Sequence, residues 1–71
     1  MYQQTIREIQ AEKGMIGKHD PRHIEGYMRL QYGTLGHLSR NDFEKEVDIC
    51  SQCIMADGEA NAEANAKSFG L

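Results

Sequence analysis

The strongest constraint on the fold is a capped apolar stripe that starts at Ser39. Ser39 is a preferred helix N-cap, and Asp42 stands three residues later, as in a capping box in which Asp replaces Glu. Beyond this cap, apolar residues recur at i, i+4, i+7 and i+11, namely at Phe43, Val47, Cys50 and Ile54. This period predicts an amphipathic helix over residues 40–56 whose stripe faces the core.

Three further helices are predicted over residues 2–13, 21–32 and 59–67. Asp20 and Pro21 supply an N-cap and a first-position proline for the second, and glycines follow the first and third. The sequence Glu-Ala-Asn-Ala occurs at 59–62 and again at 63–66, and its alanines allow another backbone to approach closely. Glu63 and Lys67 are spaced for an i, i+4 ion pair. We therefore expect an all-α fold without sheet, a small bundle of three to four short helices.

The length of the chain limits how much apolar surface it can bury. Its 71 residues form one domain, residues 1–71, with 39% hydrophobic residues and no Trp. A domain of this size keeps much of its surface exposed and is marginally stable. We therefore expect self-association, most simply as a homodimer, through apolar side chains outside the main stripe: Ile49, Met55, Phe69 and Leu71.

The compartment follows from what the sequence lacks. No apolar run approaches the roughly 20 residues of a membrane span, and the first residues are polar rather than those of a signal peptide. These features predict a cytoplasmic protein without membrane association, in which cysteines stay reduced.

A structural zinc site is the alternative that the cysteines raise. Cys50-x-x-Cys53, together with His19 and His23, could supply four tetrahedral ligands. Cys50, however, belongs to the apolar stripe, and Pro21 prevents the two histidines from sharing a regular helical turn. We expect no metal and no other cofactor.

No set of residues indicates catalysis. His37 precedes Ser39 closely, but a catalytic histidine needs an orienting partner and a nucleophile, and the Ser39 hydroxyl is better explained as a cap. The chain is not expected to be an enzyme.

Acidic residues on the third predicted helix are candidates for partner binding. Asp42, Glu44, Glu46 and Asp48 spread around the polar surface of that helix, and Tyr32 is placed to be exposed. Such acids usually form a solvated face. The alternative is an acidic surface that docks on a basic groove of another protein.

Direct nucleic-acid binding is a further alternative, through Arg22, Arg29 and Arg40. Residues 1–40 hold six of the eight basic residues, but the net charge of this half is only +2, and nucleic-acid-binding surfaces usually concentrate more positive charge. Direct nucleic-acid binding is therefore not expected.

The run DPRHIEGYMRLQYG over residues 20–33, continued to Leu38 and Ser39 and followed by the acidic helix, resembles small phage-encoded accessory proteins. Anti-CRISPR and other anti-defence proteins belong to that group. The resemblance covers about half of the chain and carries no diagnostic motif, so it assigns no functional residue. It implies a binder in the host cytoplasm that blocks a bacterial defence (CRISPR–Cas) complex by occupying a surface.

Overall fold

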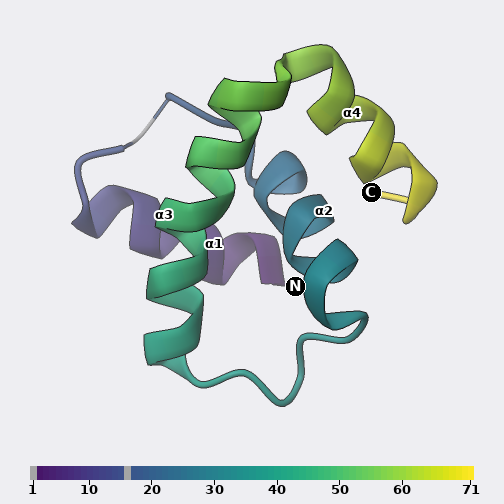
Figure 1. Cartoon of the computed structure of the whole chain (residues 1–71). Helices are drawn as coiled ribbons and strands as arrows, with labels where there is room; N and C mark the ends of the chain where they lie inside the picture. The colour runs from purple at the N-terminus through teal and green to yellow at the C-terminus, as the bar shows by residue number, and fades with distance from the viewer. Residues whose placement is uncertain (1, 16) are drawn as a thin grey trace.

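The computed structural model describes residues 2–15 and 17–71, and it confirms the predicted all-α fold (Figure 1). Within these residues the chain forms four helices and no strand. The helices are α1 (Tyr2–Glu12), α2 (Pro21–Tyr32), α3 (Arg40–Asp57) and α4 (Glu59–Ser68). Each bound lies within one residue of the bound that the caps and apolar periods predict.

Side chains next to the helix starts satisfy the first free backbone N–H groups. A carboxylate oxygen of Asp20 accepts a hydrogen bond from the backbone N–H of Arg22 at 2.9 Å. At α3 the capping box is complete: Asp42 N–H donates to Ser39 Oγ at 3.1 Å, and Ser39 N–H donates to the Asp42 carboxylate at 3.3 Å. These bonds explain why α2 and α3 begin where the sequence predicts.

Glycines with positive φ end three of the helices. Behind α1, Gly14 adopts φ 71° and donates to the carbonyl of Ala11, while Met15 donates to the carbonyl of Gln10 at 2.7 Å. This pair of bonds is a Schellman motif, which requires the left-handed backbone that glycine adopts without strain. Gly58, at φ 95°, is the one residue between α3 and α4.

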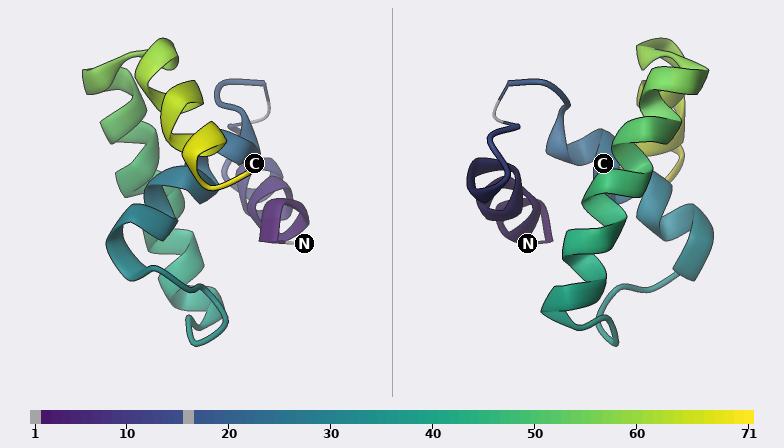
Figure 2. Two further views of the ribbon diagram at one scale, coloured as in Figure 1. Left: turned by 90° about the vertical axis from the view of Figure 1, so that its right-hand side faces the viewer. Right: turned by 60° about the vertical axis from the view of Figure 1, so that its left-hand side comes forward.

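Two helices form the centre of the molecule, and the other two flank them. The α2–α3 pair is in contact, and α1 and α4 each pack on both members of that pair. In the described part of the chain α1 and α4 do not contact each other, and the right-hand view of Figure 2 shows them on opposite sides. The central pair therefore joins the two flanking helices.

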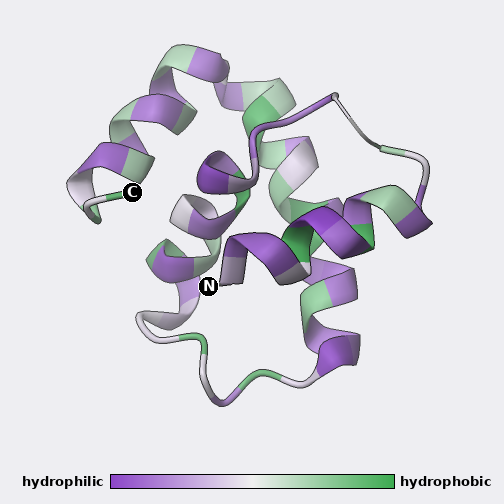
Figure 3. Ribbon diagram, turned by 180° about the vertical axis from the view of Figure 1, so that it is seen from behind, coloured by the Kyte–Doolittle hydropathy of each residue, from purple (hydrophilic) through white to green (hydrophobic). Residues whose placement is uncertain are grey.

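The core lies between these four helices and matches the predicted stripe. Phe43, Val47, Cys50 and Ile54 are buried. They belong to one cluster with residues from the other three helices and Leu35, including the predicted α2 residues Ile24, Tyr27 and Met28. Hydrophobic and hydrophilic residues alternate along each ribbon in Figure 3, as expected for helices with one inward face. None of the four helices in the described residues has the length and hydropathy that a membrane span requires.

The contact between α2 and α4 depends on small residues. A Cβ atom added to Gly26 would lie 3.2 Å from both the Cα and the backbone N of Ala66. Ala62 and Ala66, one from each Glu-Ala-Asn-Ala repeat, are fully buried. The expectation that these alanines admit a neighbouring backbone is confirmed.

Candidate functional site

The predicted acidic surface on α3 is largely engaged with side chains of the same molecule. Asp42 belongs to the capping box. Glu44 lies 3.5 Å from Arg40, and Asp48 forms a 2.8 Å ion pair with Lys13. These three acids keep some exposure, but Glu44 and Asp48 have positive charges nearby and Asp42 accepts a backbone N–H, which weakens them as a docking surface for a basic partner.

Glu46 departs from the expectation of a solvated acidic face. Its side chain is only 5% exposed, and it accepts hydrogen bonds from the Tyr32 hydroxyl at 3.0 Å and from the Cys50 thiol at 3.8 Å. The prediction that it lies on the polar surface is wrong, because Glu46 stands one turn before Cys50 on the buried side of α3. The bond to Glu46 raises the pKa of Tyr32, whose ring remains 38% exposed.

The four candidate zinc ligands do not meet at one point. Among residues 2–15 and 17–71, no three His, Cys, Asp or Glu side chains are placed to hold a metal ion. Cys50 is fully buried, and burial, with Glu46 nearby, raises the pKa of its thiol well above the ordinary range. A protonated thiol is a poor metal ligand at neutral pH. Cys53 is half-buried on the same helix.

A charged cluster joins the start of α2 to α4. Arg22 donates through both terminal nitrogens to the Glu63 carboxylate, at 3.2 and 2.9 Å, and to the Leu71 carbonyl at 2.8 Å. The buried ring of His23 donates from Nε2 to Glu63 at 2.9 Å, and its Nδ1 lies 3.5 Å from Glu59. The hydrogen bonds from Arg22, followed by those from His23, lower the pKa of Glu63 to about 2.

This cluster corrects one prediction from the sequence. Glu63 forms its hydrogen bonds with α2, and in the described residues it forms no ion pair with Lys67, one turn later on α4. A bidentate guanidinium with a histidine beside it is a stronger partner than an exposed ammonium at i, i+4. Local spacing could not reveal this partner, since Arg22 and Glu63 are 41 residues apart.

The arginines considered for nucleic-acid binding also have carboxylate partners. Arg22 binds Glu63, while Arg29 pairs with Glu25 at 2.9 Å and Arg40 with Glu12 at 2.8 Å. Paired guanidinium groups contribute little free positive charge for phosphates. The expectation that direct nucleic-acid binding is absent stays a prediction, and these ion pairs support it.

Ten of the eleven acids have a hydrogen-bond or ion-pair partner within 4 Å. The partners are arginine, lysine, histidine, tyrosine, glutamine, cysteine or backbone and capping groups. The ten acids are Glu8, Glu12, Asp20, Glu25, Asp42, Glu44, Glu46, Asp48, Asp57 and Glu63. The negative net charge is thus distributed over internal pairs rather than gathered in one uncovered patch.

Three of the four residues predicted to mediate self-association are exposed. The exposed fractions are 44% for Ile49, 75% for Met55 and 38% for Phe69. Leu71 is half-buried, and its N–H donates to the carbonyl of Ala66. Leu30 is also 55% exposed, a residue that sequence reasoning did not single out.

These apolar residues do not form a single patch on α3. Ile49 and Met55 are six residues apart, so at 3.6 residues per turn they point about 120° apart. Ile49 instead shares a line with Lys45, Gln52 and Ala56, spaced i, i+4, i+7 and i+11 and all exposed. We call these four residues the outer face of α3. The spacing of these four residues relative to the buried stripe places them on the opposite side of the helix, so this face could have been predicted from the sequence.

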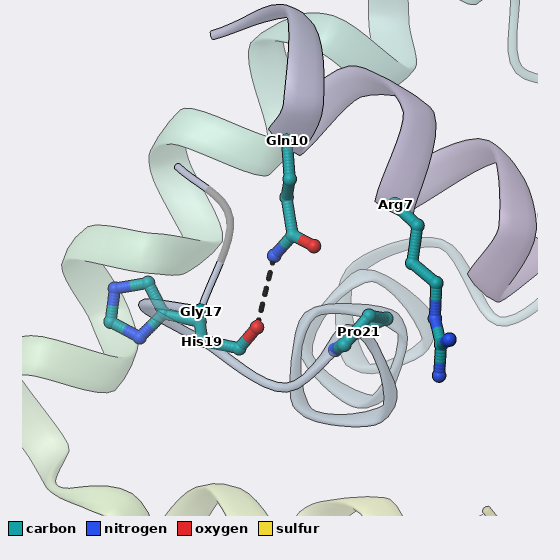
Figure 4. A pocket seen from close by; sticks show the side chains of 5 residues that line it. All are labelled: Arg7, Gln10, Gly17, His19 and Pro21. Atoms are coloured by element: carbon teal, nitrogen blue, oxygen red, sulfur yellow. Dashed lines mark hydrogen bonds between the residues drawn. The ribbon is translucent and has the colours of Figure 1, made fainter. Parts of the chain in front are cut away.

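A cavity of about 330 Å³ lies between α1 and the segment that leads into α2 (Figure 4). It is lined by Arg7, Gln10, Gly17, His19 and Pro21. Gln10 is 4% exposed, and its Nε2 donates to the His19 carbonyl at 3.1 Å. Sequence reasoning missed this cavity, although a glutamine next to the apolar residue Ile9 was a signal that polar atoms face inward.

His37 and Ser39, the residues considered as a catalytic pair, each make a separate structural contact. The His37 ring meets the Tyr32 ring edge-on, with centroids 6.1 Å apart. The Ser39 hydroxyl accepts the capping bond from Asp42.

Comparisons with protein-family models, with curated proteins and with solved structures found no match.

Proposed function

We propose that this chain is a small non-enzymatic domain that works by binding another protein. Within that class, we propose an inhibitor of the phage type that blocks a bacterial defence complex, such as a CRISPR–Cas complex, by covering part of its surface. It would act in the cytoplasm of the host cell. The burial of ionisable and nucleophilic side chains supports this proposal. His23, Glu46 and Cys50 are buried in contacts that stabilise the fold.

The observation that carries the proposal is the uncovered outer face of α3. This helix has 18 residues, about 27 Å at 1.5 Å per residue, and the largest extent of the molecule is 26 Å. Ile49 stands near the middle of the face, 44% exposed, and Lys45 beside it has no carboxylate partner among the described residues. An exposed apolar side chain surrounded by polar ones can serve as the central anchor of a contact with another protein.

A plasmid-interference assay tests the proposal. The chain would be expressed in bacteria whose CRISPR–Cas system targets an incoming plasmid, across a panel of system types. We expect the wild type to restore plasmid transformation against at least one system. Ile49→Glu should abolish that effect, because it places a charge at the centre of the contact.

Ala60→Glu is the matched control, since it introduces the same charge at an exposed position on α4. This variant should keep the wild-type effect. If no system in the panel is inhibited, the defence-inhibitor proposal fails. If Ile49→Glu acts like the wild type, the outer face of α3 is not the binding surface.

A further inference from the structure

We propose that the cavity between α1 and the segment leading into α2 binds a carboxylate that has an N–H donor and an apolar side chain on the same carbon. The C-terminal residue of a peptide and a free N-acylated amino acid share this chemistry. The cavity lies away from the outer face of α3, so this proposal does not depend on the proposed function.

The first observation is an amide oxygen that faces the cavity. Gln10 is 4% exposed, and its Nε2 donates to the His19 carbonyl. Because a carbonyl only accepts hydrogen bonds, this bond places the Gln10 nitrogen toward His19 and the oxygen on the other side. Figure 4 shows that oxygen on the side of Arg7 and Pro21, while the His19 ring points away from both.

The Gln10 oxygen accepts no hydrogen bond from residues 2–15 and 17–71, and it is not among the enclosed side-chain atoms without a partner in that part of the chain, so it is open to the cavity. A ligand N–H inside the cavity can therefore donate to it.

The second observation is a guanidinium at the same cavity. Arg7 precedes Gln10 by three residues, so both side chains leave α1 on the same side. In the part of the chain that the structure describes, Arg7 has no carboxylate partner, unlike Arg22, Arg29 and Arg40. A guanidinium binds a carboxylate through two parallel hydrogen bonds.

The remaining walls fit a small apolar group. The Pro21 ring lies between Gln10 and Arg7 in Figure 4, and a Cβ built on Gly17 would meet nothing within 4 Å. The volume of about 330 Å³ is at the lower end of the range for small-ligand sites. The cavity therefore has room for one residue with its termini, and not for a helix of a partner.

Nuclear magnetic resonance titration of the full chain with N-acetyl-L-leucine tests the proposal. We expect saturable shifts of the Gln10 side-chain amide and the Gly17 backbone amide in the millimolar range, because a small ligand with few contacts binds weakly. N-acetyl-L-leucinamide, which lacks the carboxylate, should give no saturable shift. Absence of saturation with the acid, or equal binding of the amide, would overturn the proposal.

Two variants distinguish binding in the cavity from nonspecific attraction of the carboxylate to basic side chains. Arg7→Gln should weaken binding by about tenfold or more, the loss typical of a charge-assisted hydrogen bond. Lys45→Gln removes an exposed positive charge on α3 and should leave binding unchanged. Equal affinity in Arg7→Gln and the wild type would contradict the assigned role of Arg7.

A second ligand distinguishes the two sources of this chemistry. Tighter binding of the peptide acetyl-Ala-Ala-Leu than of N-acetyl-L-leucine would indicate a peptide C-terminus, since the extra residues add contacts outside the cavity. Equal affinity would indicate a free N-acylated amino acid. Neither ligand shifting Gln10 would overturn the proposal for both sources.

Discussion

Gly26 shows how a single missing methyl group can decide whether two helices pack. Its position against the Cα and N atoms of Ala66 leaves no room for a Cβ at ordinary contact distance. The atoms in the way belong to a backbone, so they cannot rotate aside as a flexible side chain would. α4 would have to shift away from α2 as a whole.

We expect Gly26→Ala to destabilise the protein despite the better helix propensity of alanine. Propensity favours Ala by about 1 kcal/mol, whereas overpacking costs about 1–3 kcal/mol. The net loss is about 1 kcal/mol, and the Tm should fall by roughly 4–8 °C per kcal/mol for a domain of this size.

Thermal unfolding followed by circular dichroism measures this effect. Gly36→Ala is the matched control, because its new Cβ would lie 3.4 Å from the Tyr2 hydroxyl, an ordinary contact. A Gly26→Ala protein that melts at or above the wild-type temperature would show that α4 moves off α2 without cost.

Local sequence rules predict some residue roles here and miss others for a physical reason. Ser39, Asp42 and Gly14 act on backbone groups a few residues away, so their roles are visible in the sequence. Glu63 and Gln10 obtain their partners only when distant elements pack, and no local pattern contains that information.

At the scale of helices, α4 depends on its neighbours for stability. It has 10 residues, no side-chain N-cap and alternate alanines that supply little apolar surface. Isolated helices shorter than about 12–15 residues are marginal in water. The buried alanines and the hydrogen bonds between Glu63 and α2 therefore hold α4 in place.

We expect part of this stabilisation to disappear in acid. The folded protein holds the pKa of Glu63 at about 2, below the ordinary value of 4.5, so the contribution is complete above pH 4.5 and declines as the pH falls toward 2. Glu63→Gln should lower the Tm at pH 7, and the gap to the wild type should narrow at pH 3.

Thermal melts of both proteins at the two pH values give this gap directly. Glu44→Gln on α3 removes an exposed carboxylate whose ion pair is local, and its gap should be small throughout. A gap for Glu63→Gln that stays constant from pH 7 to pH 3 would contradict the stabilising role of the charged form.

Helix bounds were predictable because caps and glycine stops lie next to the ends that they define. The arrangement of the helices was not, because several packings can bury the same stripes. Glu46 is an example. In the sequence it is one of several acidic residues on the same helix, and it gains a buried hydrogen-bond partner only because Tyr32 of α2 packs against it.

At the scale of the whole molecule, paired charges and exposed apolar side chains coexist on a small surface. Ile49 and Met55 point about 120° apart on α3, while Leu30 belongs to α2 and Phe69 follows α4. The angle between Ile49 and Met55 favours a contact that uses one of these two residues as an anchor. Ile49 is the best placed of them, since the outer face of α3 surrounds it.

We expect the protein to self-associate as a dimer at micromolar concentration. Two-fold pairing is the commonest way for a small domain to cover exposed apolar side chains. Light scattering should give a mass near twice the chain mass of 8.0 kDa. Ile49→Glu should return the mass to that of one chain if the outer face of α3 forms the contact, whereas Phe69→Ser should do so if the end of α4 forms it.

A mass of one chain over a wide range of concentrations would rule out the dimer. The outer face of α3 would then be free for a foreign partner. A dimer that survives both substitutions would place the contact elsewhere on the molecule.

The separation of α1 from α4 by the central pair has a consequence for how substitutions combine. Two changes that are far apart and share no contacting residue have nearly additive effects on the free energy of unfolding. Changes in α1 and in α4 meet this condition where they touch different residues of α2 and α3. Such positions of the flanking helices can accumulate substitutions independently of one another, and the central pair must remain compatible with both.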